Sequence, residues 1–413
     1  MTMIPIGLNE RTEVFDKVAD LTAKRLFAPG FNRADWIAAV ESHRDRILKC
    51  ETVEEFEGAV RDLLAELKIS HVVFFHQSLQ KIASNYAIGA TFQPCQVNGT
   101  VRWMFQDVHD GSPPALAGIR PGDLLLDIDG QPIFPPEKPA FRMGGFCQIG
   151  VEKLSGEQVR VPLGVPLPKS KWHPINRPRL VSWSKPARGI GYLKAAGFPG
   201  QVGMDVAREI DRAISELHDC DRLIVDLRGN PGGGAGGLRL MSYLTPDKIP
   251  VGYSLSKKRA EKGYDKEKLP RFGKIPSRKI ELFGLAFRYA FADKSIVMVT
   301  EGLGPQPFHG RIVLVVNQHT ASAAETITGF ARENKLATIV GTRTAGQVLG
   351  GTGFKVGHGF VLRIPVMTFY TWNGNCLEGK GVEPDHIIEL SRDALRQGRD
   401  TQTDKACAAI GGF

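Results

Sequence analysis

The sequence predicts an α/β protein built from an N-terminal helical region, a small β-rich unit and a larger core. From residue 190 onward, short apolar runs alternate with amphipathic helical stretches, an order typical of a largely parallel sheet covered by helices. Between residues 87 and 165, short strand-like runs are instead separated by turn sequences. At roughly 150 residues per domain, 413 residues suffice for two or three domains.

Helices are expected in the first 70 residues, followed by a strand. The string Thr52-Val-Glu-Glu55 is a capping box, in which the two end residues each satisfy a backbone amide at a helix start. Apolar residues then recur at helical spacing as far as Leu67. The apolar run 72–75 predicts a strand, so we assign 1–70 to a helical region and 71–86 to a strand and linker.

Turn chemistry divides residues 87–165 into short strands. Residues 111–118 indicate a turn that enters a short helix, and the apolar run 124–128 predicts a strand that ends at Asp129-Gly130, a hairpin signal. A stretch rich in Pro, Lys and Trp, residues 165–179, is typical of a linker.

The core is expected over residues 166–390, with 391–413 as a C-terminal tail. Its strands are predicted at 190–195, 222–227, 311–316 and 337–341, and its helices at 202–217 and about 321–334.

Composition excludes several classes of protein. With 42% hydrophobic and 23% charged residues, the chain is neither disordered nor fibrous. No run approaches the roughly 18–20 apolar residues of a membrane span. The N-terminus shows no secretory signal, so we expect a cytoplasmic protein, or a periplasmic one if a signal has been removed. The six cysteines form no C-x-x-C pair, which favours free thiols over disulfides or a zinc site.

The net charge of +9 is concentrated in one segment, residues 257–279, which holds ten Lys or Arg against three acids. Such a run is typical of a solvated face or mobile loop, and it could also steer acidic substrates. No nucleic-acid-binding motif accompanies it, so no nucleic-acid partner is expected.

A serine follows the predicted buried strand 311–316. In the string Val316-Asn-Gln-His-Thr-Ala-Ser-Ala-Ala-Glu325, Ser322 stands where the next helix begins, and the helix-start amides and dipole would favour a developing oxyanion. That siting suits a nucleophile. Taken alone, the string is more typical of Thr320 or Ser322 acting as a simple N-cap.

A glycine-rich loop follows the predicted strand 222–227. Its glycines allow backbone amides to approach a ligand closely. The loop lacks the residue order of a P-loop or a dinucleotide-binding loop, so no cofactor is expected, and an amide pair for an oxyanion fits better. The alternative is a flexible turn.

A serine nucleophile needs a base, and His71 is a candidate. It lies where the helical region passes into an apolar strand, although a lone histidine there is more often a satisfied, half-buried side chain. His319 is closer to Ser322 in sequence, but it lies in the preceding turn, where it can hardly face the hydroxyl.

Four strings in one order resemble the carboxyl-terminal processing, or tail-specific, serine peptidases. These are Asp226-Leu-Arg-Gly-Asn-Pro-Gly-Gly, Thr320-Ala-Ser-Ala-Ala-Glu325, Gly341-Thr-Arg-Thr-Ala-Gly346 and Glu378-Gly-Lys-Gly-Val-Glu-Pro-Asp385. Residues 111–133 resemble the PDZ domain of that family. The resemblance implies a crotonase/ClpP-like α/β core with an inserted PDZ-like domain. Ile88, Gly89 and Ala90 look like the loop that grips a peptide's terminal carboxylate.

The resemblance also implies roles for individual residues. Ser322 would be the nucleophile, with an oxyanion hole formed by the amides of Ala323 and of Gly232 or Gly233. One departure matters: the best-known branch places a catalytic lysine 25 residues after the serine, and here that residue is Gln347.

The branch typified by the tricorn protease instead uses Ser–His–Glu with a second serine directly before the histidine. Ser70 and His71 match that pair, and Glu378 matches the acidic residue. This implies that His71 is the general base and acid, oriented by Glu378 and Ser70.

The sequence therefore predicts a serine endopeptidase whose PDZ-like domain engages the C-termini of peptide or protein substrates. Two alternatives stay open. The interphotoreceptor retinoid-binding repeats resemble this fold and hold apolar ligands without catalysis, and an adaptor could recruit protein C-termini with a purely structural core. The oligomeric state is not predicted. The pKa of His71 is expected near 6.5, shifted by Glu378.

Overall fold

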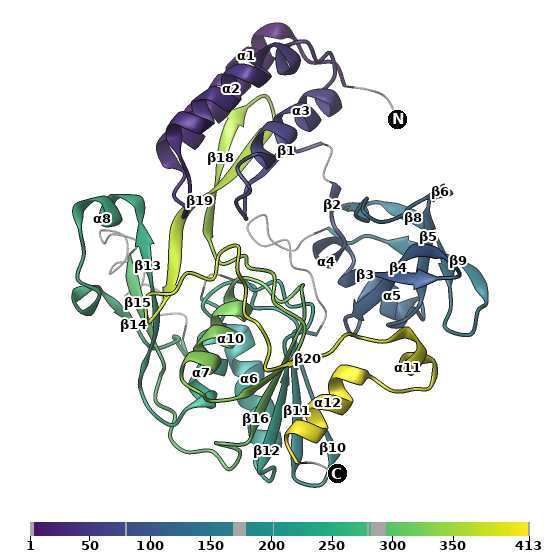
Figure 1. The fold of residues 1–413 in the computed structure, drawn as a ribbon, viewed down its shortest axis with the longest axis vertical. Coiled ribbons are helices and arrows are strands. Elements are labelled where there is room, and N and C mark those ends of the chain that lie inside the picture. The colour runs from purple at the N-terminus through teal and green to yellow at the C-terminus, as the bar shows by residue number, and fades with distance from the viewer. Residues whose placement is uncertain are drawn as a thin grey trace.

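The computed structural model describes residues 4–78, 81–167, 179–200, 202–278, 281 and 295–411 (Figure 1). The expected linker at 165–179 and the last residue of the basic segment lie largely outside this part of the chain. The α/β class is confirmed: helices and several sheets form a core, a β-rich unit and a helical N-terminal region.

Three helices form the N-terminal region: α1 (Leu8–Arg25), α2 (Arg33–Leu48) and α3 (Val53–Ala65). The predicted capping box is present, since the Glu55 amide donates to Thr52 Oγ1 at 3.2 Å and the Thr52 amide donates to Glu55 Oε2 at 3.3 Å. The apolar helix faces pack on core strands, where the ring centroids of Phe56, Phe74 and Phe360 lie 5.1–6.2 Å apart. The helices thus cover one end of the core (Figure 1).

A six-stranded sheet forms the centre of the core. In spatial order its strands are β10 (Val181–Ala187), β11 (Ile190–Ala195), β12 (Arg222–Asp226), β16 (Ile312–Val316), β17 (Thr338–Gly341) and β20 (His386–Ile387). All neighbours from β11 to β20 pair in parallel, as the β-α-β order predicts, and β10 joins β11 antiparallel.

Helices cover both faces of this sheet. One face packs against α6 (Met204–Glu216), α7 (Gly237–Leu244) and α10 (Ala323–Glu333). The other face, which includes Ile224 and Val315, packs against α12 (Thr401–Ala409). Side chains of a strand alternate between its two faces, so a sheet covered on both sides needs the nearly continuous apolar runs that predicted it.

A second, mostly antiparallel sheet lies beside the first. Its strands are β1 (Val73–His76), β19 (Phe360–Thr371), β13 (Pro250–Ser256), β15 (Ile296–Val299) and β14 (Arg271–Phe272), with β18 (Gly350–Gly357) paired to β19. The basic segment supplies β14, the short helix α8 (Lys257–Lys262) and the 3₁₀ turn η1 (Lys266–Lys268). Of these strands only β1 is predicted from the sequence.

The β-rich unit, here called the PDZ-like unit, is an antiparallel sheet. Its strands are β3 (Ala90–Val97), β4 (Thr100–Val108), β5 (Leu124–Ile128), β6 (Gln131–Pro132), β8 (Phe146–Glu152) and β9 (Gln158–Gly164). The short helix α5 (Pro113–Leu116) begins after Ser112, as the turn sequence predicts. A separate pair, β2 (Lys81–Ala83) with β7 (Ala140–Arg142), and helix α4 (Ser84–Ala87) complete the unit.

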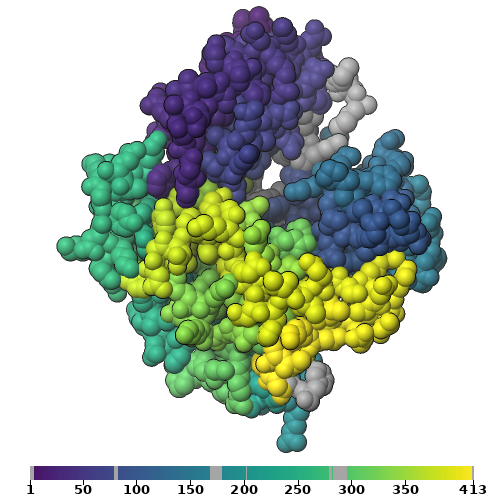
Figure 2. Space-filling view, viewed as in Figure 1, coloured from purple at the N-terminus to yellow at the C-terminus, as the bar shows by residue number. Residues whose placement is uncertain are grey.

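The C-terminal segment is folded and bridges two parts of the molecule. Helix α11 (Arg392–Arg396) lies against the PDZ-like unit, where Arg392 Nη2 is 3.0 Å from Glu152 Oε1. Helix α12 covers the parallel sheet of the core. In Figure 2 this segment, in yellow, runs across the core to the blue PDZ-like unit. No helix in the described ranges is both long and apolar enough to span a membrane.

Candidate active site

Ser322 lies at a strained turn between β16 and α10. Its φ of 55° and ψ of −119° place a non-glycine residue in the left-handed region, a cost that is commonly found at functional sites. The residue occupies the N-cap position of α10, and its amide donates to Glu325 Oε2 at 3.2 Å as in a capping box. Thr320 is bonded elsewhere, since its hydroxyl donates to the Leu227 carbonyl at 2.9 Å. The N-cap interpretation therefore applies to Ser322, but it does not explain the strained φ of this residue.

Ser70, His71 and Glu378 come together although 308 positions separate Ser70 from Glu378. Ser70 Oγ is 2.8 Å from His71 Nδ1 and donates to Glu378 Oε2 at 3.0 Å. The Ser70 amide also donates to Glu378 Oε1 at 2.9 Å. An ionised carboxylate only accepts, so it takes the single hydroxyl proton of Ser70. Ser70 Oγ must then accept from Nδ1–H, which leaves Nε2 as the unprotonated, basic nitrogen of a neutral His71 ring.

The segment 346–348 joins this group to Ser322. The Ser322 amide donates to the Gln347 carbonyl at 2.8 Å. The next amide, of Val348, donates to Glu378 Oε2 at 3.0 Å. On the adjoining strand β18, a Cβ built on Gly351 would lie 3.7 Å from His71 Cβ. The two predicted segments therefore lie in one region. Among the described residues no hydrogen bond reaches His71 Nε2, so the Ser322–His71 bond of an assembled triad is not formed.

Burial sets the protonation of His71. Removal of the ring from solvent, and to a lesser degree the positive charge of Arg363, lower the pKa of His71 from 6.5 to about 4. The ring is therefore neutral at neutral pH, as a general base requires. The sequence leads us to expect a shift caused by Glu378, whereas these two causes produce it.

The glycine-rich loop lies against the turn at 320–323 that carries Ser322, here called the nucleophile turn after the role predicted for Ser322. A Cβ on Gly232 would be 2.6 Å from Ser322 Cβ and 2.7 Å from the Ala323 amide nitrogen, so the approach requires glycine. The Gly232 amide itself donates to Asn230 Oδ1 at 2.8 Å. Within the described chain the amides of Gly233 and Ala323 have no hydrogen-bond acceptor. Of the two glycines proposed from the sequence, Gly233 is therefore the one with a donor to offer an oxyanion.

Glu325 is a site residue that the sequence argument did not single out. Its buried carboxylate accepts from the amides of Ser322 (3.2 Å), Gly346 (2.6 Å) and Gln347 (2.7 Å), and from Thr344 Oγ1 (2.6 Å). Burial raises the pKa of Glu325, and these hydrogen bonds oppose the rise. The carboxylate fixes the 344–347 segment against the nucleophile turn. The S-x-x-E spacing from Ser322 to Glu325 is the signal that could have revealed it.

The predicted carboxylate-gripping loop is buried in this structure. Ile88 is 1% exposed and Ala90 is 0% exposed, and Gly89 has a φ of 64° with its carbonyl bonded to the His109 amide. On the neighbouring strand β3, the Phe92 carbonyl accepts from Nε2 of His319 at 2.9 Å. His319 thus binds the PDZ-like unit and is not directed at Ser322, which agrees with the sequence argument.

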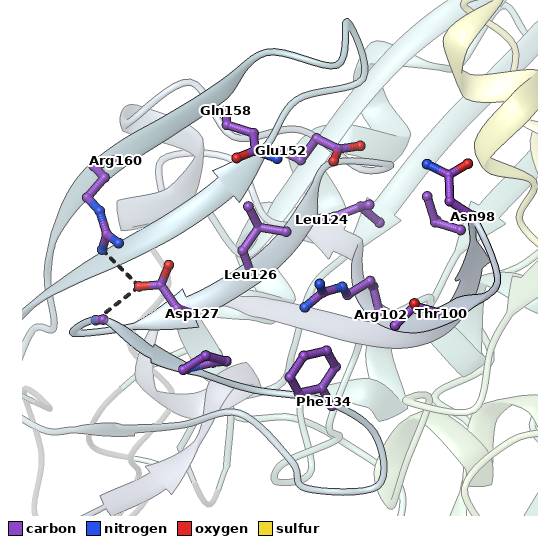
Figure 3. A pocket seen from close by; sticks show the side chains of 13 residues that line it. Asn98, Thr100, Arg102, Leu124, Leu126, Asp127, Phe134, Glu152, Gln158 and Arg160 are labelled. Carbon is purple, nitrogen blue, oxygen red and sulfur yellow. Dashed lines mark hydrogen bonds and ion pairs between the residues drawn. The ribbon is translucent and has the colours of Figure 1, made fainter.

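A pocket of about 500 Å³ lies elsewhere on the PDZ-like unit (Figure 3). Arg102 lies over the ring of Phe134, 4.3 Å from its centroid, and Arg160 is paired with Asp127 at 2.9 Å. None of the predicted catalytic residues lines it. In the described part of the chain no three His, Cys, Asp or Glu side chains are placed to hold a metal. All six cysteines are free thiols.

A parallel core with a PDZ-like unit ahead of it is the architecture of the carboxyl-terminal processing peptidases. Residues 189–388 match the model of peptidase family S41, and residues 104–140 match a PDZ domain. The match to peptidase family S41 over residues 189–388 agrees with the family that the motifs predict.

Several known proteins are similar to this chain. A tricorn protease homolog of Streptomyces coelicolor is 25% identical over 430 residues, which cover 96% of this chain and 32% of that protein. The carboxyl-terminal-processing protease of a Synechocystis species is 25% identical over 284 residues, 68% of this chain and 57% of that protein. The chain thus spans between about a third and three-fifths of the length of these two relatives. The solved structure of a photosystem II D1 C-terminal processing protease shares the fold, with a TM-score of 0.57 at 18% identity over 97% of each chain.

Proposed function

We propose that this chain is a serine endopeptidase of the carboxyl-terminal processing type that acts on peptides or proteins. The observation that carries the proposal is the Ser70–His71–Glu378 relay, which leaves a basic Nε2 on His71 and is joined to Ser322 through the Gln347–Val348 backbone. A histidine in this relay supplies the base that Gln347 cannot.

The chemistry follows from these groups. His71 Nε2 takes the Ser322 hydroxyl proton as Oγ attacks the peptide carbonyl, and the amides of Gly233 and Ala323 bind the resulting oxyanion. Collapse of the tetrahedral intermediate breaks the C–N bond, and the imidazolium returns its proton to the leaving amine. Water then hydrolyses the acyl-enzyme with His71 again as base.

The proposal assigns to the PDZ-like unit the capture of substrate C-termini. Strand β3 pairs with β4 alone among the described strands, so its second edge has the form that accepts an added peptide strand. Because Nε2 of His319 bonds to the Phe92 carbonyl of β3, we expect capture along this strand to require the unit to separate from the turn at 317–319.

Covalent labelling tests the catalytic proposal. A fluorophosphonate probe should label the wild-type chain at Ser322, and Ser322→Ala should abolish labelling and peptide hydrolysis. Ser215→Ala, which removes an exposed serine of α6, is the matched control and should label normally. An unlabelled wild-type chain would instead point to a non-catalytic binding protein on this fold.

The C-terminal preference needs a separate test. One peptide is compared with a free and with an amidated C-terminus, and Gly89→Arg is compared with wild type. We expect the amide and the variant to raise KM. Equal cleavage of both peptides would remove C-terminal capture from the proposal without affecting the catalytic part.

A further inference from the structure

Helix α12 reaches the oxyanion loop through one buried arginine. Arg228 lies two residues after the end of β12 and precedes Gly232 and Gly233 in the loop, and only 6% of it is exposed. Its guanidinium donates to three side chains of the first turn of α12: Nη1 to Asp400 Oδ2 (2.8 Å) and Gln402 Oε1 (3.1 Å), and Nη2 to Thr403 Oγ1 (3.2 Å).

The same guanidinium is anchored on the sheet. Nε donates to Asp226 Oδ1 at 3.0 Å and Nη2 donates to Asp226 Oδ2 at 2.9 Å, and the Arg228 amide adds a third bond to Oδ1 at 2.9 Å. Tyr192 on β11 also donates its hydroxyl to Asp226. Arg228 is thus held between a strand of the sheet and the start of α12, with two carboxylates balancing one buried cation.

Helix α12 is also held in place by contacts that do not involve Arg228. Ala406, Cys407 and Ile410 pack on the outer face of the parallel sheet. Gln402 is fully buried and its Nε2 donates to the Ile388 carbonyl at 2.9 Å. Because these contacts do not involve Arg228, the helix can serve as a fixed support for it.

Other restraints on the loop come from segments outside α12. The Gly229 amide donates to Asn317 Oδ1 at 3.0 Å, and Asn230 Nδ2 donates to the Ala195 carbonyl at 2.8 Å. The Phe198 amide donates to the Gly232 carbonyl at 2.8 Å. These bonds tie the loop to the nucleophile turn and to the end of β11, and Arg228 ties it to α12.

We propose that Arg228, held by Asp400, Gln402 and Thr403, is a positioning residue through which the C-terminal helix fixes the oxyanion loop. The inference rests on the proposed peptidase function. An oxyanion donor contributes only when it is already aimed at the transition state, so a looser loop weakens transition-state binding more than substrate binding. The signature is a lower kcat with an unchanged KM.

Asp400→Asn tests this with little disturbance of the helix. Asp400 Oδ1 caps α12 by accepting from the amides of Gln402 and Thr403, both at 3.0 Å, and asparagine caps equally well. With that oxygen kept as the cap, the substitution removes the charge opposite Arg228 and replaces Oδ2, the acceptor of Arg228 Nη1, with an NH₂ group. Asp404→Asn is the control, since it removes a half-exposed carboxylate of the same helix whose partner Arg399 is 3.6 Å away.

We expect Asp400→Asn to lower kcat about tenfold, with KM and the rate of substrate release near wild type, while Asp404→Asn leaves all three unchanged. Thermal unfolding of each variant is measured in parallel. If Asp400→Asn is unfolded at the assay temperature, the same kinetic comparison is made with Thr403→Ala, which removes only the hydroxyl contact to Arg228. An unchanged kcat, or a fall that Asp404→Asn reproduces, overturns the inference. Wild-type labelling by fluorophosphonate keeps that outcome distinct from a failure of the proposed function itself.

Discussion

Glu378→Gln tests how the tautomer of His71 is set. The carboxylate accepts three hydrogen bonds: Oε1 from the Ser70 amide, and Oε2 from Ser70 Oγ and the Val348 amide, at 2.9–3.0 Å. A glutamine keeps one acceptor oxygen. If its NH₂ replaces Oε1, two donors face each other at the Ser70 amide. If its NH₂ replaces Oε2, it meets the Val348 amide and donates to Ser70 Oγ, which must then donate to Nδ1 and move the ring proton to Nε2.

Either orientation removes at least one charge-assisted hydrogen bond, worth about 1.5–3 kcal/mol. If this loss appears in the transition state, kcat falls by about ten- to 150-fold. The assay is hydrolysis of a chromogenic peptide, with unfolding measured on the same samples. Glu383→Gln, an exposed carboxylate beyond the same turn, is the control and should behave as wild type. A Glu378→Gln enzyme within twofold of wild type, beside an inactive Ser322→Ala, would show that the relay does not orient His71.

Three further perturbations follow from the same contacts. First, because the pKa of His71 is about 4, kcat/KM should stay high below pH 6 and fall only as the ring gains its proton near pH 4. Arg363→Gln removes a positive charge near the ring and should move this acidic fall in kcat/KM to higher pH. A fall centred at pH 6.5 in the wild type would contradict the burial of the ring. The same shift makes the folded ring bind a proton less readily than the unfolded one, so stability measured by denaturant should decline as pH falls from about 6.5 towards 4. Second, Gly232→Ala places a Cβ 2.6 Å from Ser322 Cβ and should lower kcat at least tenfold. The control is Gly310→Ala, at a glycine with a similar φ of 80° and open space around it, which should affect stability alone. Equal kcat values in the two variants would show that the close approach of Gly232 is not required. Third, Arg392→Met leaves Glu152 without its buried partner and should lower the free energy of unfolding by about 3 kcal/mol. The control Arg396→Met, at an exposed arginine of the same helix, should lower it by less than about 1 kcal/mol. Equal losses in the two variants would refute the role of the Arg392 contact.

The parallel core could be predicted because its strands are buried on both faces and its helices are amphipathic. The run at β11 matches its observed bounds, and α6, β12, β16, β17 and α10 lie within a few residues of prediction. The antiparallel sheet beside it is a different case. Strand β18 contains glycines at 350, 351, 353 and 357, so its sequence carries no alternating apolar pattern. It is a strand because its backbone pairs with β19, and this pairing cannot be recognised from the side chains of β18.

The candidate site was predictable where local sequence carries the geometry. Ser322 follows a buried strand and precedes a helix, and both are visible in the local sequence. The glycines at 232 and 233 likewise indicate that the backbone of this loop approaches a neighbouring group closely. The position of His71 is not local: it depends on β1 pairing antiparallel with β19, where Val73 lies opposite Arg363. Its place between the helical region and an apolar strand made His71 a candidate, and only the resemblance to a known family paired it with Ser322. The burial of the 88–90 loop arises within the PDZ-like unit, where Ile88 and Ala90 join an apolar cluster with Phe105 that is assembled from several strands.

The route by which His71 reaches the site also explains the N-terminal helices. In the absence of a lysine at Gln347, the proposed mechanism takes its base from another segment, the connection between α3 and β1. That connection is held by α1, α2 and α3, whose buried side chains form one cluster with Phe74, Val356, Phe360 and Leu362 of the second sheet. His71 itself has a φ of 59°, a conformation that the surrounding packing must impose. On the proposed mechanism, the helices support the general base and are not a separate module. A substitution that leaves a cavity at Phe56, remote from the chemistry, should therefore disturb catalysis through His71 before it unfolds the core.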